Sequence, residues 1–395
     1  MTSVDTRPLP SFAILVAISA IGPLALNIFI PSMPGLQAEF AISYGEAQLT
    51  LTLFLIGMAL CQLIYGPISD RIGRRPMLLG GLAVFVVASV LAAFAPTIEV
   101  LIGARLLQAL GGAAGIVLAR AMVRDVFERD KAASVISYIT MAFVVAPMVA
   151  PVLGGFIDHY AGWRTDFWLL GALGAAVLLA SWFRLPETHV TRGAGNAVGL
   201  AEAAIRLFAI GRFRSYTVTL SFTSAVFFAF LGGAPHIMVD VLKRTPMEYG
   251  IWFVIVSLGY MTGNFLSGRF TQRIGIDRMV LYGCAITLLG GVLCLGSAIS
   301  GLLSPATLFV PMAFAAFGNG LTIPNGTAGA ISVDPRLTGS AAGWSGFAQM
   351  ACGAAASQLV GSLQGNWPLA VFWFMAVASM LALASHVLAI RRSVS

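Results

Sequence analysis

Residues 66–75 of this chain read GPISDRIGRR, and they lie between two long apolar runs at 49–65 and 77–95. The stretch carries charges of both signs, and its glycines and proline favour a sharp chain reversal. A hairpin this charged cannot lie in hydrocarbon, so it marks a membrane surface between two membrane-length helices. Its arginines indicate the cytoplasmic surface, because short cytoplasmic loops are enriched in Lys and Arg.

The same pattern returns in the second half of the chain. Residues 68–81 read ISDRIGRRPMLLGG and residues 270–283 read FTQRIGIDRMVLYG, so that Arg71 aligns with Arg273 at a constant offset of 202 residues. This offset is about half of the 395 residues, which predicts two similar halves. Two parallel halves of about six helices each are typical of secondary transporters.

The composition indicates a membrane protein. Hydrophobic residues make up 58% of the chain, charged residues only 10%, and the mean hydropathy is +0.90. A soluble domain carries about 25% charged residues, so most of this surface must face lipid. The net charge of +7 comes from small basic groups between apolar runs, a pattern typical of loops beside an anionic leaflet. We therefore expect the lipid bilayer, and no nucleic acid, as a partner.

The sequence offers no catalytic or metal motif. It contains no HExxH, GxSxG or P-loop pattern, which argues against an enzyme and against ATP-driven transport. All cysteines lie inside apolar runs without CxxC spacing, so we interpret them as buried small residues. They are Cys61, Cys284, Cys294 and Cys352. We expect no cofactor, no metal and no catalytic residue.

Apolar runs of about 20 residues recur along the whole chain, as membrane-spanning helices require. We predict an all-α membrane protein with twelve transmembrane helices in two six-helix bundles. The expected spans are residues 11–31, 48–68, 76–95, 98–121, 133–157, 164–184, 216–237, 249–269, 278–299, 304–325, 338–362 and 367–390.

These spans divide the chain into an N-terminal bundle (1–187), a cytoplasmic linker (188–213) and a C-terminal bundle (214–395). An amphipathic segment within the linker, around 202–208, suits either the membrane surface or a simple tether. Most arginines and lysines then fall in the inner loops when both termini are cytoplasmic. The outer loops hold only Arg164, Lys243 and Arg244.

Several ordered stretches resemble the major facilitator superfamily. Residues 66–81 resemble its signature loop between the second and third helices, RLLQALG at 105–111 its fourth-helix motif, and APMVAPVLGG at 146–155 the fifth-helix motif of drug:proton antiporters. One departure is Ala109, where glycine is usual. The stretches ARAMVRD (119–125), GWR (162–164), LPET (185–188) and FAFLGGAP (228–235) extend the resemblance to the Bcr/CflA family of bacterial drug efflux transporters.

The resemblance implies a monomeric, multi-pass protein of the bacterial inner membrane. It would export small drug-like molecules by alternating access, with protons as the coupling ion. A second hypothesis remains open, a specific metabolite or organic-anion exporter with unusual or no proton coupling. Fold alone does not decide between them.

The charged hairpin is the first candidate site. Asp70 can pair with Arg71 or Arg74, or face the N-terminus of a helix in the other half, and would then act as an electrostatic latch between moving bundles. The alternative is that the arginines only anchor the topology. The gating-loop residues assigned here are Gly66, Asp70, Arg71, Gly73, Arg74 and Arg75.

The fourth and fifth helices supply the next candidates. Arg105 lies well inside an apolar run, where an arginine is costly and usually functional, and Gln108 is one turn later. The pair could face a central cavity, bind an anion or perturb a proton-carrying acid; alternatively, Arg105 extends outward to the membrane surface. In the fifth helix, prolines bend the helix and glycines allow close approach, which suits a pivot or an ordinary kink. These residues are Pro147, Pro151, Gly154 and Gly155.

The resemblance also reveals a departure that concerns coupling. Bcr/CflA proteins usually carry an acid in the first helix, whereas Asn27 stands at that place and cannot exchange a proton near neutral pH. Asp166 is the best replacement candidate, followed by Asp158 and His236, although each could be a plain interfacial residue.

An expected substrate cavity would be apolar with a few hydrogen-bonding groups, which suits moderately hydrophobic, neutral or weakly charged compounds. Its aromatic members could instead face lipid. The residues assigned to it are Asn27, Phe227, Phe228, Asn264, Asn319, Asn325, Trp344 and Gln349.

Overall fold

The computed structural model describes residues 10–126, 145–146, 149–188, 199–334, 336–365, 367 and 369–394, and within these ranges all regular structure is helical. The first half contains a long helix interrupted near its end, followed by a series of membrane-length helices. These are α1 (Phe12–Ile28), the short η1 (Ile30–Ser32), α2 (Met33–Phe40), α3 (Tyr44–Ile72), α4 (Arg74–Ala93), α5 (Ile98–Val126), helical residues 149–161 and α7 (Arg164–Arg184).

The second half begins with a short helix and continues with long ones. These are α8 (Leu200–Ala209), α9 (Gly211–His236), the π-helical turn η2 (Ile237–Val241), α10 (Pro246–Ile274), α11 (Ile276–Ile299), α12 (Pro305–Ile331), α13 (Thr338–Leu363) and α14 (Ala370–Val394).

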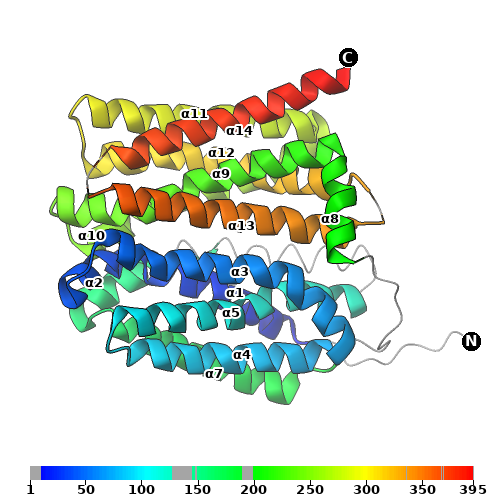
Figure 1. Cartoon of the computed structure of the whole chain (residues 1–395), viewed down its shortest axis with the longest axis horizontal. Helices are drawn as coiled ribbons and strands as arrows, with labels where there is room; N and C mark the ends of the chain where they lie inside the picture. Colours follow the sequence, from blue (N-terminus) through cyan, green and yellow to red (C-terminus); the bar gives the residue numbers. More distant parts are fainter. Residues whose placement is uncertain are drawn as a thin grey trace, which may run out of the picture.

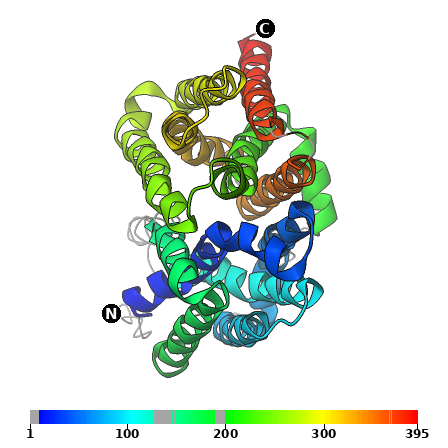
Figure 2. The ribbon, with the colours of Figure 1, turned by 90° about the vertical axis from the view of Figure 1, so that its left-hand side faces the viewer.

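The long helices form two bundles lying side by side (Figures 1 and 2). Helices α3, α4, α5 and α7 pack together in the first, and α9 to α14 pack together in the second. Helix α8 crosses the molecule at the end where α3 joins α4, which we call the hairpin end; the α2 end lies opposite (Figure 1). Ten of the described helices are long and apolar enough to cross a membrane, so the all-α membrane class is confirmed.

Two of the twelve expected spans are not among these ten. The span at 133–157 is described only at 145–146 and from 149 onward, and its remainder lies outside the described residues. The span at 338–362 is helical, as α13, but it is not apolar enough to count as a candidate span. Its polar and small residues have a structural reason, because α13 packs along α3 of the other bundle rather than against lipid alone.

The internal repeat is visible at the level of single residues. Helices α3 and α10 both span 29 residues and start at 44 and 246, which is the offset of 202 found in the sequence. Both begin with a hydroxyl cap, because Ser43 accepts a hydrogen bond from Glu46 N and Thr245 accepts one from Glu248 N.

Both helices also end in the same way. Gly73 and Gly275 follow α3 and α10 with φ +105° and +91° and the same ψ of 151°. These dihedrals are strongly disfavoured for residues with a Cβ atom, so glycine is required for the sharp turn into the next helix. The hairpin of 66–75 is therefore a repeated element of both halves.

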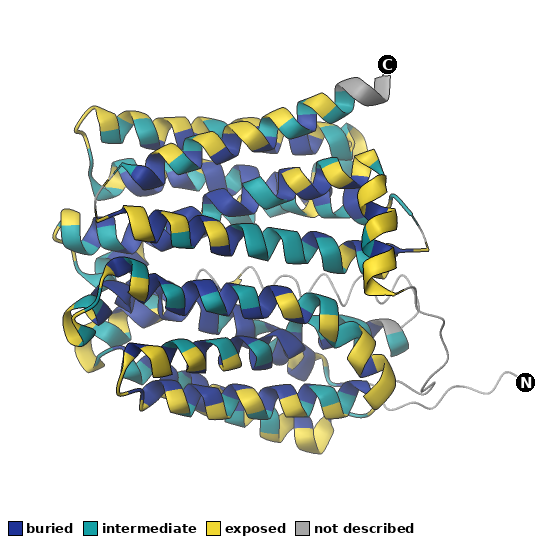
Figure 3. Cartoon of the chain, viewed as in Figure 1, coloured by how far each residue is buried: buried dark blue, intermediate teal, exposed yellow. Residues whose placement is uncertain are grey.

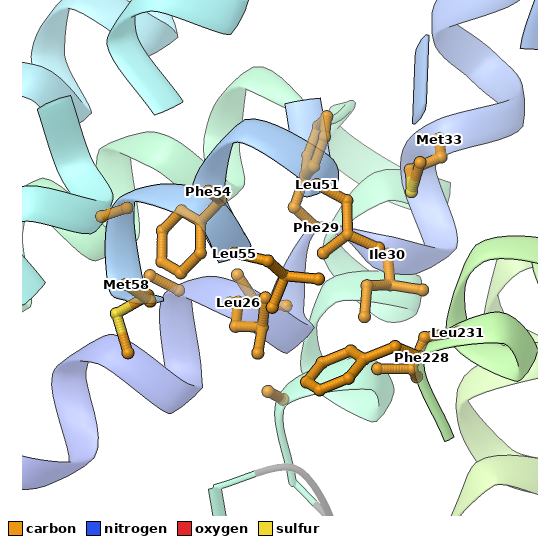
Figure 4. Packing of buried hydrophobic residues seen from close by; sticks show 14 of the residues in the cluster. Leu26, Phe29, Ile30, Met33, Leu51, Phe54, Leu55, Met58, Phe228 and Leu231 are labelled. Carbon is orange, nitrogen blue, oxygen red and sulfur yellow. The ribbon is translucent and has the colours of Figure 1, made fainter. Parts of the chain in front are cut away.

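Exposed residues lie along the helices between the two ends (Figure 3), and many of them are large and apolar, as a lipid-facing surface should be. Phe183, Phe94 and Phe265 are among the most exposed. The buried core runs across both halves, because Phe228 and Leu231 of α9 pack near Ile30 and Leu26 of the first half (Figure 4).

The linker region contains the expected amphipathic segment as α8. Its apolar residues Ala203 and Leu207 are buried against Phe213 and Leu337 of the second bundle, whereas Ile205 is exposed. Helix α9 already begins at Gly211, three residues before the expected start of the C-terminal bundle, because the helix continues through the polar residues 211–215 at the hairpin end.

Candidate functional site

The first hairpin is held together by a buried arginine. Arg74 is 8% exposed and pairs with Asp70 at 2.6 Å and with Asp125 of α5 at 3.1 Å. It also donates to the Ser69 hydroxyl and, at 3.4 Å, to the Gly66 carbonyl. Arg74 therefore ties the end of α3 to α5 within one bundle, and Asp70 has its ion pair in that same bundle.

A carboxylate from the end of α7 completes this cluster. Glu187 accepts from the backbone N–H groups of Arg74 at 3.0 Å and Arg75 at 3.2 Å, so it caps the N-terminus of α4. The Arg75 side chain donates to the Trp182 carbonyl at 2.7 Å. Arg71, in the last turn of α3, is exposed.

Sequence reasoning missed two members of this cluster. Asp125 and Glu187 lie in the stretches 119–125 and 185–188 that carry the family resemblance, yet they contact the hairpin from 51 and 113 residues away in the sequence. Their acidic character beside an arginine-rich loop was the available signal, although no local spacing connects them to Arg74.

The second hairpin is fastened differently. Asp277 occupies the place equivalent to Arg75 and pairs with Arg212 at 3.3 Å at the start of α9. It also accepts from the Tyr216 hydroxyl, and its backbone carbonyl contacts His386 at 2.8 Å. Each hairpin is thus tied to its own bundle, with the signs of the charges reversed.

Arg105 is enclosed in the centre of the first bundle. Its side chain is 0% exposed and donates to the Ala25 carbonyl at 3.0 Å and to Gln108 Oε1 at 2.5 Å. Gln108 in turn donates to the Ser89 hydroxyl at 2.8 Å. Helices α1, α4 and α5 are therefore linked by one polar chain, and Arg105 does not extend outward to the membrane surface.

Aromatic rings surround the guanidinium. Its central carbon lies 4.2 Å from the centroid of the Phe54 ring, 5.4 Å from that of Phe29 and 5.7 Å from that of Phe167. Such contacts stabilise a desolvated cation. Two of its nitrogens, Nε and Nη2, have no hydrogen-bond partner in the described part of the chain.

The unusual Ala109 of the fourth-helix motif is explained by its neighbour. Gly57 of α3 faces it, and a Cβ atom at Gly57 would lie 2.9 Å from the Ala109 side chain. The small residue needed for close helix approach is therefore supplied by α3 rather than by α5.

Asp166 lies in the first turn of α7 and is 0% exposed. The Ser32 hydroxyl donates to its Oδ2 at 3.3 Å, and Oδ1 has no partner among the residues that the structure describes. Asp158, which is partly exposed, also interacts with Ser32. The Asp166 carboxyl and the Arg105 guanidinium interact electrostatically without a hydrogen bond between them.

The other two polar candidates lie elsewhere. The Asn27 amide donates to the Pro23 carbonyl of its own helix at 2.8 Å. His236 Nδ1 lies 2.7 Å from Asp240 Oδ2, and the His236 ring is 4.9 Å from the Tyr44 ring of the first half. His236 is thus at the contact between the halves.

The fifth-helix residues that the structure describes lie between the two halves. A Cβ atom on Gly154 would overlap the Ile28 carbonyl of α1, and one on Gly155 would overlap the Pro246 carbonyl of α10. The Pro151 carbonyl lies 2.5 Å from where a Cβ of Gly250 would be. The fourth predicted member of this set, Pro147, falls outside the described residues.

Several residues assigned to a cavity are engaged in helix packing. Asn319 accepts from the Thr287 hydroxyl at 3.1 Å, and Asn325 donates to the Ser267 hydroxyl at 2.8 Å, both inside the second bundle. Asn264 donates to a carbonyl of its own helix.

The remaining assigned residues contact neighbours in the second half. Gln349 accepts from the Ser224 hydroxyl at 3.3 Å, and Phe228 stacks edge-on against Phe227. Trp344 is partly buried against Phe347, and its ring N–H has no partner in the described chain.

A polar seam that the sequence did not indicate joins the bundles along α3 and α13. The Gln48 amide donates to the Ser357 hydroxyl, and Thr52 donates to Gln358 at 2.8 Å. Gln358 donates onward to the Gly45 carbonyl at 3.0 Å. We call these residues the α3–α13 seam.

No group of three or more His, Cys, Asp or Glu side chains within the described ranges is placed to hold a metal ion. The candidate sites are charged and polar clusters inside and between two helical bundles.

The comparisons with known proteins agree with this architecture. Residues 15–357 match the Major Facilitator Superfamily. The chain is 31% identical over 327 residues to "Multidrug resistance protein D" of Escherichia coli (strain K12), covering 83% of this chain and 82% of that one. It is 26% identical over 374 residues to the "Bicyclomycin resistance protein homolog" of Haemophilus influenzae, covering 93% of both.

A solved structure, that of a D-xylose-proton symporter, superposes with a TM-score of 0.77 at 15% identity and covers 96% of each chain, which shows a common fold. The family match and the two relatives confirm the family resemblance expected from the sequence, and the shared fold confirms the expected fold class. The family match also confirms a transporter of small molecules rather than an enzyme. This chain belongs to the Major Facilitator Superfamily of membrane transporters.

Proposed function

We propose that this chain exports small drug-like molecules across the bacterial inner membrane by alternating access, in exchange for protons. The observation that carries the proposal is the α3–α13 seam between two bundles that repeat each other. Hydrogen bonds and glycine contacts such as those of Gln48 and Gly45 can break and re-form, whereas interlocked side chains resist separation. The drug-resistance proteins among the relatives support the substrate class.

The charge distribution supports the orientation. The hairpin end carries Arg71, Arg74, Arg75, Arg273 and Arg278, so we place it in the cytoplasm with both chain termini. The α2 end then faces the periplasm, and the α3–α13 seam begins there.

The aromatic and amide residues assigned to the cavity in the second half support a moderately hydrophobic substrate. Phe227 of α9 is partly buried, and Gln349 of α13 accepts from Ser224 of α9, one turn before Phe227. Trp344 is partly buried at the hairpin end, beside Phe208 of α8. Aromatic faces with few hydrogen-bonding groups suit neutral or weakly charged compounds.

The alternative of an organic-anion exporter rests on Arg105. That guanidinium is 0% exposed and is enclosed by the Ala25 carbonyl, Gln108 and three aromatic rings, so a solute in the arrangement seen here does not reach it. We therefore favour the drug-like substrate and assign Arg105 an electrostatic task inside the bundle.

The first test uses proteoliposomes that contain the purified protein. Internal pH is followed while drugs, amino acids and organic acids are added one at a time, with and without an imposed proton gradient. Proton release that depends on a drug-like compound supports the proposal. Transport of an organic acid that is indifferent to the gradient would replace it by the second hypothesis.

Alternating access predicts that the α3–α13 seam must open. A Cβ atom on Gly45 would lie 3.5 Å from the Ser362 Cβ, a separation that suits a disulfide. In a variant whose native cysteines are serines, Gly45→Cys with Ser362→Cys should cross-link under oxidation and stop transport, and a reductant should restore it. Each single cysteine variant is the control. Full transport by the cross-linked protein would contradict alternating access at this seam.

A further inference from the structure

Asp166 and Asp158 lie close together at the α2 end of the first bundle, beside the contact with the second. We propose that these carboxyls, bridged by Ser32, form the proton-exchange site of this transporter. They take over the task of the first-helix acid whose place is held by Asn27. The inference rests on the proposed proton coupling and names the groups that carry it.

The surroundings of Asp166 suit a group that gains and loses a proton. The side chain is fully buried, and among the residues that the structure describes its carboxylate accepts one hydrogen bond, the long one of 3.3 Å from Ser32 to Oδ2. Its other oxygen, Oδ1, has no partner there. A buried carboxylate that is merely structural is normally fully hydrogen-bonded. An incompletely bonded one can exist in either protonation state at moderate cost.

In the described part of the chain, few other charged groups lie near this carboxyl. Arg105 approaches from α5, Asp158 from helical residues 149–161, and His159 lies next to Asp158. Glu39 of α2 is engaged by Arg164 and by the Trp163 ring N–H. Helix α1 and residues 82–93 of α4 contain no titratable side chain.

Within the described residues, Asp166 therefore interacts with one cation, Arg105, and with a second acid, Asp158. With both acids ionised the cluster carries an excess negative charge in a site of low polarity, so one of them holds a proton readily. Because both interact with Ser32, its hydroxyl can pass the proton between them. The step is a simple proton binding, a carboxylate plus a proton giving a carboxylic acid, and release is the reverse.

Asp158 supplies the route to water. It is partly exposed, whereas Asp166 is fully buried, so a proton from the periplasmic side reaches Asp158 first. The Ser32 bridge then leads inward to Asp166, whose charge interacts with Arg105.

The same cluster touches the moving contact. Asp158 lies one turn beyond Gly154 and Gly155, and Gly155 packs against Pro246 of the second bundle. The short η1, which contains Ser32, contacts both α9 and α10. A change of charge at Asp158 and Asp166 therefore alters the electrostatic environment at the contact between the two halves. Proton binding can in this way favour one arrangement of the bundles over the other.

The test compares wild type with Asp166→Asn, which mimics the protonated form in shape. Uphill transport driven by a pH gradient should fall by about tenfold or more, a range typical of coupling between sites. Substrate counterflow, which needs no net proton movement, should persist and lose its pH dependence. Asp166→Glu should restore uphill transport in part. Glu202→Gln, an exposed acid paired with Arg206 on α8, is the matched control and should change nothing.

A second readout needs no substrate. Infrared titration of the protein in nanodiscs should show a carboxylic-acid band that changes with pH in wild type and Glu202→Gln, and that is absent in Asp166→Asn. Lack of this band in wild type, or its persistence in Asp166→Asn, overturns the inference. So does undiminished uphill transport by Asp166→Asn, or a loss of counterflow that Asp166→Glu does not restore.

The two readouts separate this inference from the proposed function. A wild-type protein that shows the titrating band but moves no protons with any substrate would refute proton coupling and leave the proton-binding site standing. Coupled transport by wild type that depends on His236 and not on Asp166 would refute the site and leave the proposed function standing.

Discussion

Replacing Arg105 by alanine is expected to abolish transport while the protein still reaches the membrane. The change removes the donor to the Ala25 carbonyl and to Gln108, and it removes the positive charge that faces Asp166. Taking one partner from buried charges costs on the order of 3–5 kcal/mol, because the remaining charge is left uncompensated. The initial rate of transport, normalised to the amount of protein in the membrane, measures the effect.

The variant Arg105→Lys tests whether the positive charge of Arg105 or its hydrogen-bonding geometry is required for transport. Lysine keeps the positive charge but cannot donate as a planar fork between Ala25 and Gln108, so transport should be reduced rather than lost. Arg206→Ala on the exposed face of α8 is the control and should transport normally. Normal transport by Arg105→Ala at normal membrane levels would refute any central role for this residue.

Replacing Gly154 by alanine is expected to destabilise the protein and to stop transport. The added Cβ would overlap the Ile28 carbonyl, which is backbone and cannot rotate away, so α1 or the helix at 149–161 must shift. Overpacking of this kind costs about 1–3 kcal/mol or more. Thermal unfolding in detergent and the transport rate should both report the change.

Gly103→Ala is the matched control for this substitution. Gly103 also lies inside a long helix, but it is exposed and a Cβ there meets nothing within 4 Å. Alanine should leave stability unchanged or raise it by up to about 1 kcal/mol through helix propensity. Equal stability and activity of Gly154→Ala and Gly103→Ala would show that the close approach of the helix to α1 is not required.

The helix contacts of Gly154 could be predicted from the sequence only in part. The glycines at 154 and 155 and the nearby prolines indicated that the fifth helix approaches others, which is a local property of small residues. Which helices they meet, α1 on one side and α10 on the other, depends on how the two bundles dock. The proposed pivot stays a prediction.

The structure of the two hairpins could also be predicted only in part. A glycine between two charged, membrane-length helices was enough to predict the turn, and the echo at Gly275 was enough to predict the repeat. The partners of the charged residues could not be predicted from the sequence. Glu187 and Asp125 contact Arg74 only because α7 packs beside α4 and α5 packs beside α3.

By itself, the sequence determined the membrane setting, the places of the helices, the two-fold repeat and the glycine turns. All of these follow from hydropathy and backbone dihedrals, which are read from neighbouring residues. Only the tertiary structure decided that Arg105 is enclosed by aromatic rings, that Asp166 is buried next to Ser32 and that α3 and α13 form a polar seam. These are contacts between residues far apart in the chain, and they depend on which face each helix turns toward its neighbours, which no local pattern specifies.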